Sequence, residues 1–126
     1  MTPLLVRDVM TIGVPVCRDT ETCGMVAARL AGGGPPVVVV LDEDGMACGW
    51  LTRERLAAEA AARPVGEVMD EDIPTVAPAI PAAAAAQMMR DHGVEFLFLM
   101  HDWPGEPRPS AVISLKAVEE RLREIV

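Results

Sequence analysis

The fold is set by one stretch of sequence, VVVVLDEDGMACGWLTRERL, which covers residues 37–56. Its first five residues are apolar and mostly β-branched, which predicts a strand buried on both faces. The acidic turn that follows ends in Gly45, which adopts positive φ without a Cβ clash and so favours a hairpin. Met46 to Leu51 then forms the second strand. Thr52 is a good N-cap, so we expect a helix over Arg53 to Ala62.

The chain contains two related copies of this pattern. Val6-Arg7-Asp8-Val9-Met10 is echoed by Val65-Gly66-Glu67-Val68-Met69, a shift of 59 residues (65 minus 6). Self-similarity at a fixed period indicates duplicated units. We therefore expect one repeat over residues 1–63 and a second over residues 64–126.

Each copy predicts the same order of elements: a short entry segment, then strand, helix, strand, strand and helix. The first helix is expected over Thr20 to Ala31, and its counterpart from Pro81 to His92. In the second copy a loop from Asp102 to Pro109 replaces the tight turn. Because a unit of about 60 residues buries too little surface to be secure alone, we expect the copies to pack together as an α/β fold with pseudo-twofold symmetry. The last helix carries one apolar stripe: Leu115, Val118, Leu122 and Val126.

Composition excludes several classes of protein. Hydrophobic residues make up 51% of the chain and charged residues 24%, as in folded globular proteins. The net charge of −8 argues against a nucleic-acid partner, which needs clustered Lys and Arg. No apolar stretch approaches the roughly 20 residues that span a bilayer, and no signal peptide is evident. Three widely spaced cysteines suit reduced thiols, so we expect a cytoplasmic protein.

The order of elements and the repeated motifs resemble a tandem pair of CBS domains, the cystathionine β-synthase type module also called a Bateman module. The resemblance covers nearly the whole chain. It implies a regulatory module, not an enzyme, with no required cofactor and no catalytic residues. It also implies an adenosine-containing ligand, such as AMP, ADP, ATP or S-adenosylmethionine, in clefts between the repeats, and a homodimer acting on a regulated protein. The carriers of the resemblance are the two entry motifs, the strand from Pro36 to Val39, the turn from Asp42 to Gly45, and Gly49-Trp50-Leu51-Thr52.

The family's usual site motif is Gly, two apolar residues, Thr or Ser, two variable residues, then Asp. In such proteins the hydroxyl serves the phosphate, the Asp holds the ribose hydroxyls and the preceding apolar strand flanks the adenine. This chain departs from the motif at the Asp position, where Arg55 and Ala117 stand. An Arg side chain only donates hydrogen bonds, and an Ala side chain neither donates nor accepts them. By resemblance the ligand-binding residues are Pro36, Val37, Val38, Trp50, Thr52, Arg53 and Arg55 in the first copy, and Glu95, Phe96, Leu97 and Ser114 in the second.

Several of these residues have two interpretations. Arg53 and Arg55 suit bidentate anion binding in a helical turn with free amides, or they are solvated surface residues separated by Glu54. Trp50 either stacks on a base or fills the core. His92 and His101 have no metal-ligand spacing, so no metal site is expected. The competing function is a ligand-independent dimerisation or interaction module with vestigial clefts, which the missing Asp favours.

Overall fold

The computed structural model describes residues 3–102 and 107–125. The chain is an α/β protein that divides into two compact units. Unit 1 comprises Met1–Gly13, Pro74–His101 and Pro109–Val126, and unit 2 comprises Val14–Ile73 and Asp102–Arg108. The units therefore cut across the two sequence repeats, because each repeat contributes its entry segment to the unit that is built mainly from the other repeat.

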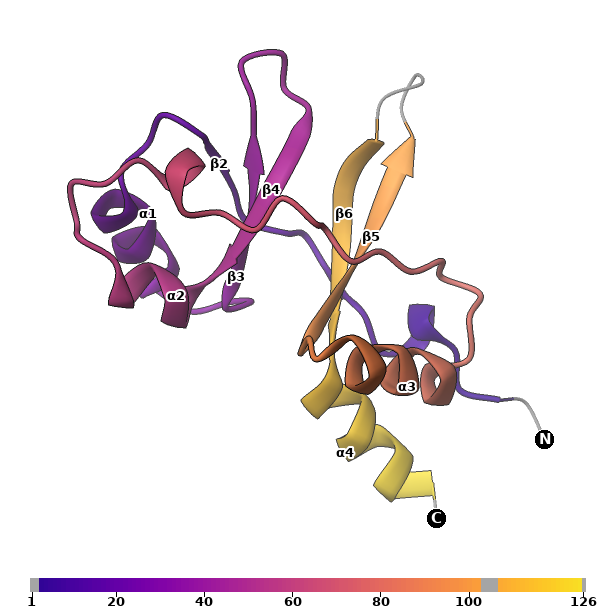
Figure 1. Cartoon of the computed structure of the whole chain (residues 1–126). Coiled ribbons are helices and arrows are strands. Elements are labelled where there is room, and N and C mark those ends of the chain that lie inside the picture. The colour runs from indigo at the N-terminus through magenta and orange to yellow at the C-terminus, as the bar shows by residue number, and fades with distance from the viewer. Residues whose placement is uncertain (1–2, 103–106, 126) are drawn as a thin grey trace. The chain divides into compact units, whose positions relative to one another are not determined.

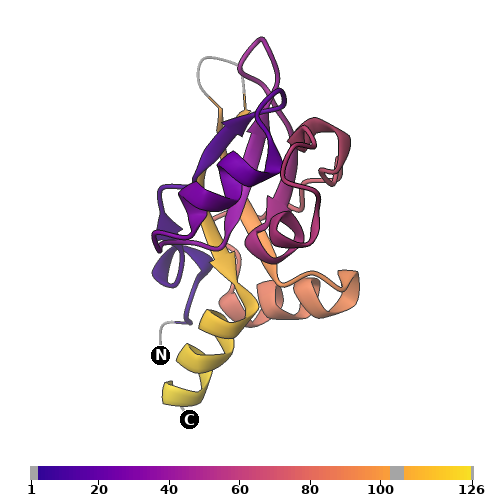
Figure 2. The same ribbon diagram turned by 90° about the vertical axis from the view of Figure 1, so that its left-hand side faces the viewer.

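Unit 2 contains a three-stranded sheet in the order β2-β3-β4. Its strands are β2 (Val16–Arg18), β3 (Val37–Leu41) and β4 (Ala47–Thr52), with β2 parallel and β4 antiparallel to β3. The predicted hairpin is confirmed: the Asp42 carboxylate accepts the amides of Asp44 at 2.9 Å and Met46 at 3.0 Å, and Gly45 has a φ of 81°. Two helices, α1 (Cys23–Leu30) and α2 (Arg53–Ala58), pack together on one side of the sheet (Figures 1 and 2).

The core of unit 2 lies between these helices and the sheet. The first four residues of β3 are buried on both faces of the strand. This is why apolar valines occupy successive positions instead of alternating with polar residues. The 3₁₀ turn η2 (Val65–Glu67) closes the core from the second entry motif. The buried residues of this core are Cys17, Cys23, Val26, Leu30, Val38, Val40, Leu51, Leu56, Val65 and Val68.

Both helices of unit 2 are shorter than predicted. Helix α1 begins at Cys23 instead of Thr20, because Thr22 caps it by accepting the Met25 amide at 3.3 Å. Helix α2 ends at Ala58 instead of Ala62. Residues 59–63 leave the helix because their carbonyls serve α1: Ala61 and Arg63 accept the amides of Gly24 and Cys23 at 2.9 and 2.8 Å. A capping role in tertiary structure thus overrides the helical propensity of an alanine-rich segment.

Unit 1 is built from the sheet β1-β6-β5 and two longer helices (Figure 1). Its elements are η1 (Val6–Asp8), β1 (Thr11–Ile12), α3 (Ala82–His92), β5 (Phe96–Asp102), β6 (Pro107–Ser114) and α4 (Leu115–Ile125). Gly93 ends α3 with a φ of 66°, as predicted, whereas Pro81 is the N-cap and not the first helical residue that the sequence predicted.

The loop predicted over Asp102 to Pro109 is shorter in the structure. Strand β5 continues through Asp102 and β6 begins at Pro107. The Ser110 hydroxyl also donates to the Leu99 carbonyl at 2.9 Å, tying the two strands together.

The core of unit 1 includes the first entry motif. Val6 has no exposed surface, and its amide donates to the Ile80 carbonyl at 2.9 Å. On the last helix Val118 is buried and Leu115 and Leu122 are partly buried against the same core; Val126 lies outside the described residues. None of the helices within residues 3–102 and 107–125 combines the length and apolar character that crossing a bilayer needs. The other core members are Val76, Ala82, Ala85, Ala86, Met89, Leu97, Leu99, Ala111 and Ile113.

Candidate functional site

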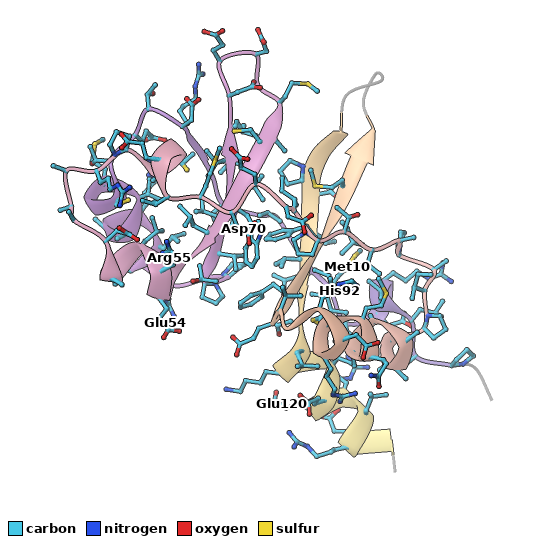
Figure 3. All side chains as sticks on the ribbon, viewed as in Figure 1. Met10, Glu54, Arg55, Asp70, His92 and Glu120 are labelled. Atoms are coloured by element: carbon cyan, nitrogen blue, oxygen red, sulfur yellow. The ribbon has the colours of Figure 1, made fainter. Side chains whose placement is uncertain are left out.

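A pocket of about 330 Å³ opens on unit 2. This volume is at the lower end of the range for small-molecule sites, which is roughly 300–1,000 Å³. One wall comes from the end of β4 and the start of α2, and the other from the segment after η2. Figure 3 places Arg55 on α2 and Asp70 on the segment that passes beside β4. The lining residues are Trp50, Leu51, Thr52, Arg55, Val68, Met69 and Asp70.

Thr52 stands where β4 becomes α2. Its hydroxyl oxygen accepts the Arg55 amide at 3.0 Å, so Thr52 is the N-cap that the sequence predicted. A hydroxyl group both accepts and donates. Its hydrogen can therefore still be donated to an acceptor in the pocket while the oxygen caps the helix.

Arg55 is the cationic residue among the described residues that line the pocket. Its side chain is 57% exposed, and its Nε donates to Glu59 Oε1 at 3.0 Å. Glu59 also accepts from Arg63 at 3.3 Å, so two arginines share one carboxylate. Exposed ion pairs contribute only about 0–1 kcal/mol. Because Glu59 keeps its pairing with Arg63, the Arg55 side chain can turn from Glu59 to a ligand anion without leaving that carboxylate unpaired.

The other groups that the sequence offered for anion binding are already engaged. The Arg53 amide donates to the Pro36 carbonyl at 2.8 Å, and the Arg55 amide is used by the Thr52 cap. The prediction of free amides in this turn is therefore wrong for these two groups, because the residue before β3 accepts one amide and the Thr52 cap accepts the other. The Arg53 side chain donates to the Leu30 carbonyl at 3.4 Å and does not line the pocket. Glu54 is exposed and also lies outside the lining (Figure 3).

Trp50 forms a buried wall of the pocket. Only 7% of the residue is exposed, and its indole N–H donates to the Asp72 carbonyl at 3.0 Å. The ring is therefore buried and held by a hydrogen bond at its polar edge. Of the two interpretations of Trp50, the structure favours packing over a free stacking surface.

Asp70 lines the pocket although the sequence did not identify it. Its backbone pairs with Trp50 through two hydrogen bonds of 3.0 Å, one in each direction. Gly49 permits this close approach, because a Cβ there would lie 2.5 Å from Met69 Sδ and 2.9 Å from the Asp70 carbonyl oxygen. The glycine that opens the motif before Thr52 was the available signal, since an unsubstituted position in a strand marks a close backbone approach.

The remaining predicted residues are distributed over both units. Val37 and Val38 are 0% and 1% exposed, so their side chains are packed inside and do not line the pocket, and Pro36 is half-buried. The second set belongs to unit 1. There Glu95 is exposed, Phe96 half-buried and Leu97 buried, and the Ser114 hydroxyl accepts the Ala117 amide at 3.1 Å in the same capping geometry as Thr52.

The cysteines are free thiols with suppressed reactivity. Burial raises the pKa of Cys17 to about 12 and also raises the pKa of Cys23 and Cys48. Cys48 Sγ lies 3.8 Å from Met69 Sδ, behind the pocket wall. Because the thiolate is the reactive form, none of the three is set up as a nucleophile. In the described part of the chain, no group of three or more His, Cys, Asp or Glu residues is placed to hold a metal ion.

Solved structures similar to this chain include CBS domains of other proteins. The CBS domain pair of protein MJ0100, in complex with 5′-methylthioadenosine and S-adenosyl-L-methionine, matches with a TM-score of 0.85 at 15% identity, over 99% of this chain and 100% of that one. The CBS domains of a transcriptional regulator from Streptococcus pneumoniae match with a TM-score of 0.73 at 16% identity, over 93% and 98%. The cytosolic domain of the Mg²⁺ channel MgtE in complex with ATP matches with a TM-score of 0.73 at 20% identity, over 90% of this chain. This chain spans 47% of that one, about half its length.

The sequence comparison gives the family directly. A search of curated proteins finds no significant match. The family model of the CBS domain, however, matches twice, over residues 6–62 and 65–123. Together these two matches account for nearly the whole chain, so this protein belongs to the CBS domain family as a pair of CBS repeats.

Proposed function

We propose that this chain is a regulatory, non-catalytic module that binds an adenosine-containing small molecule in the unit 2 pocket. The observation that carries the proposal is the pocket itself, which Thr52 and Arg55 both line at the start of α2. A hydroxyl and a guanidinium together suit a phosphate or carboxylate, because both groups donate hydrogen bonds and one carries a positive charge.

The ligands of similar structures support this class of ligand. The similar CBS pair of MJ0100 holds 5′-methylthioadenosine and S-adenosyl-L-methionine, and the similar cytosolic domain of MgtE holds ATP. These compounds share an adenosine moiety and differ in what is attached at its 5′ position. We therefore infer that the ligand of this chain contains adenosine. The group at the 5′ position is the variable to be tested.

Binding would act through the segment after η2. Val68, Met69 and Asp70 line the pocket and belong to the second sequence repeat, while Thr52 and Arg55 belong to the first. A ligand that contacts both walls favours the arrangements in which they stand at the right separation. It shifts the balance between arrangements only by its differential affinity for them.

The first experiment measures binding through the tryptophan of the pocket. The chain has two tryptophans and no tyrosine, so Trp103→Phe leaves Trp50 as the single strong emitter. Titrating this variant with AMP, ADP, ATP and S-adenosylmethionine should change the Trp50 emission in a saturable way for at least one compound. The same compound at 100 times its dissociation constant should stabilise the chain by about 2.7 kcal/mol, seen as a rise in melting temperature of several degrees.

Matched arginine variants locate the site. Arg55→Ala removes the pocket cation, whereas Arg63→Ala removes the other arginine that pairs with Glu59 but does not line the pocket. We expect Arg55→Ala to weaken an anionic ligand about tenfold or more, as for loss of a charge-assisted hydrogen bond. Arg63→Ala should leave the affinity unchanged. If no adenosine compound alters either the emission or the melting temperature at millimolar concentration, the proposal is wrong.

The second candidate is an interaction module without a ligand. It is favoured by the absence of the motif Asp, replaced by Arg55 and Ala117, and by an open groove on unit 1 lined by Arg90, Glu119, Leu122 and Arg123. On this proposal the chain works in the cytoplasm as a homodimer that docks on a regulated protein. Light scattering after size-exclusion chromatography measures the dimer directly, and a monomer at all concentrations would exclude it.

A further inference from the structure

Among the described residues that line the unit 2 pocket, Asp70 is the acidic one, and the proposed hydroxyl and guanidinium contacts do not use its carboxylate. It stands in a pocket whose motif position for a carboxylate is occupied by Arg55. The pocket therefore contains both an acidic and a basic residue. The basic residue stands at the motif position on α2, and the acidic residue comes from the segment after η2.

The position of Asp70 is fixed by its backbone. Two hydrogen bonds of 3.0 Å join it to Trp50, and the Gly49 gap lets the segment lie against the strand. The side chain is oriented as well, because Asp70 Oδ1 accepts the Asp72 amide at 2.9 Å. A carboxylate that is held at one oxygen presents its other oxygen in a defined direction.

The carboxylate is also not neutralised by a neighbour. Among the side chains of the described residues, Asp70 takes part in none of the ion pairs, and Arg55 pairs with Glu59 instead. Asp70 is exposed, so its second oxygen is accessible to solvent or to a ligand. An ionised carboxylate only accepts hydrogen bonds, so its complement is a group that donates them.

We infer that Asp70 supplies the ribose-binding carboxylate that the motif position lacks, so that the pocket selects ribonucleosides with both ribose hydroxyls present. The inference rests on the proposed function. An adenosine compound with a 5′ anion offers two vicinal hydroxyl donors for Asp70 and an acceptor for Arg55. A 2′-deoxy compound keeps the anion and the base but loses one donor.

The experiment compares ribose and 2′-deoxyribose forms of the adenine nucleotides on the full chain by isothermal titration calorimetry. The variants are Asp70→Asn, which keeps the side-chain volume and the oxygen that accepts the Asp72 amide, and Glu71→Gln. Glu71 is exposed, carries the same charge one residue further along the chain, and does not line the pocket. Glu71→Gln therefore controls for the loss of one negative charge near the site.

The wild-type chain should bind the ribonucleotide about tenfold to a hundredfold more tightly than its 2′-deoxy form, the range for a hydrogen bond to a charged group. Asp70→Asn should weaken the ribonucleotide by a similar factor and leave the two forms nearly equal, while Glu71→Gln keeps the wild-type ratio. If the ribonucleotide binds but the ratio is close to one in the wild type, or survives in Asp70→Asn, this inference is overturned and the proposed function stands. If no nucleotide binds, both are overturned.

Discussion

At the scale of single residues, Gly49 determines whether the pocket can form. A Cβ at this position would lie 2.5 Å from Met69 Sδ, 2.7 Å from Met69 Cγ and 2.9 Å from the Asp70 carbonyl oxygen. The methionine side chain can move, but the carbonyl belongs to the backbone pairing with Trp50. We therefore predict that Gly49→Ala destabilises the chain by about 1–3 kcal/mol, as overpacking does.

Urea unfolding of Gly49→Ala beside Gly32→Ala tests this prediction. An added Cβ at Gly32 would meet only the Arg29 carbonyl at 3.7 Å, an ordinary contact, and its φ is not positive. Gly32→Ala should therefore be neutral or slightly stabilising. Equal stabilities for the two variants would show that the segment after η2 does not press against β4.

Cys17 gives the chain a specific alkaline sensitivity. Burial raises the pKa of its thiol from 9.0 to about 12, so the folded chain keeps the proton over a pH range in which the unfolded chain releases it. The stabilising effect is complete below pH 9 and is lost as the pH rises toward 12. Between pH 8 and pH 10.5 we expect Cys17 to account for a loss of about 1–2 kcal/mol in the free energy of unfolding.

The comparison that isolates Cys17 is the pH dependence of Cys17→Ala. The absence of tyrosine removes one common source of alkaline titration. The variant starts less stable, because it lacks a buried sulfur, but its stability should fall less steeply above pH 9. An identical slope in wild type and variant would assign the alkaline loss to other groups.

Part of the candidate site could be predicted from the sequence. Trp50, Thr52 and Arg55 follow from the strand-to-helix motif and line one pocket. Asp70 does not follow, because it lies 15 residues beyond Arg55 (70 minus 55) and reaches the pocket through a backbone pairing. Sequence periodicity predicts which face a side chain takes within an element. It does not predict which strand a loop will lie beside.

At the scale of elements, local signals are predicted well and tertiary capping is not. The hairpin and the helix ended by Gly93 were predicted because their signals are local. The end of α2 was missed because the segment after it is held by α1. Ala61 and Arg63 accept the first amides of α1, and a Cβ on Gly24 would lie 2.9 Å from Ala61 Cβ. The helical propensity of residues 59–63 is overridden because their carbonyls accept the first amides of a helix distant in sequence.

The contact between Gly24 and Ala61 can be tested as a pair. Gly24→Ala should destabilise unit 2 by about 1–2 kcal/mol, although alanine is normally favoured over glycine in a helix by about 1 kcal/mol. Ala61→Gly removes the nearest clashing atom, so the double variant should recover part of the loss. A double-mutant cycle in chemical denaturation measures this coupling, and strictly additive effects would contradict the contact.

At the scale of the whole molecule, the two entry motifs occupy equivalent places in opposite units. Val6 is buried in unit 1, where η1 bonds to the segment before α3, and Val65 is buried in unit 2, where its amide donates to the Glu21 carbonyl at 2.9 Å. The sequence repeat predicts that the two valines are equivalent. It does not predict that each packs against the elements of the other repeat, because the repeat pattern is the same for either arrangement.

Because each entry motif packs in the unit built mainly from the other repeat, two matched substitutions should affect opposite units. Val6 and Val65 are both 0% exposed, so truncating either one to alanine leaves a cavity that costs about 2 kcal/mol. Because amide exchange reports local opening, Val6→Ala should speed exchange in α3, β5 and α4, while Val65→Ala should speed it in α1, α2 and β3. Hydrogen exchange with mass spectrometry resolves these segments, and each variant is the control for the other. If Val6→Ala instead sped amide exchange in α1 and β3, the elements of its own repeat, the packing of each entry motif against the other repeat would be contradicted.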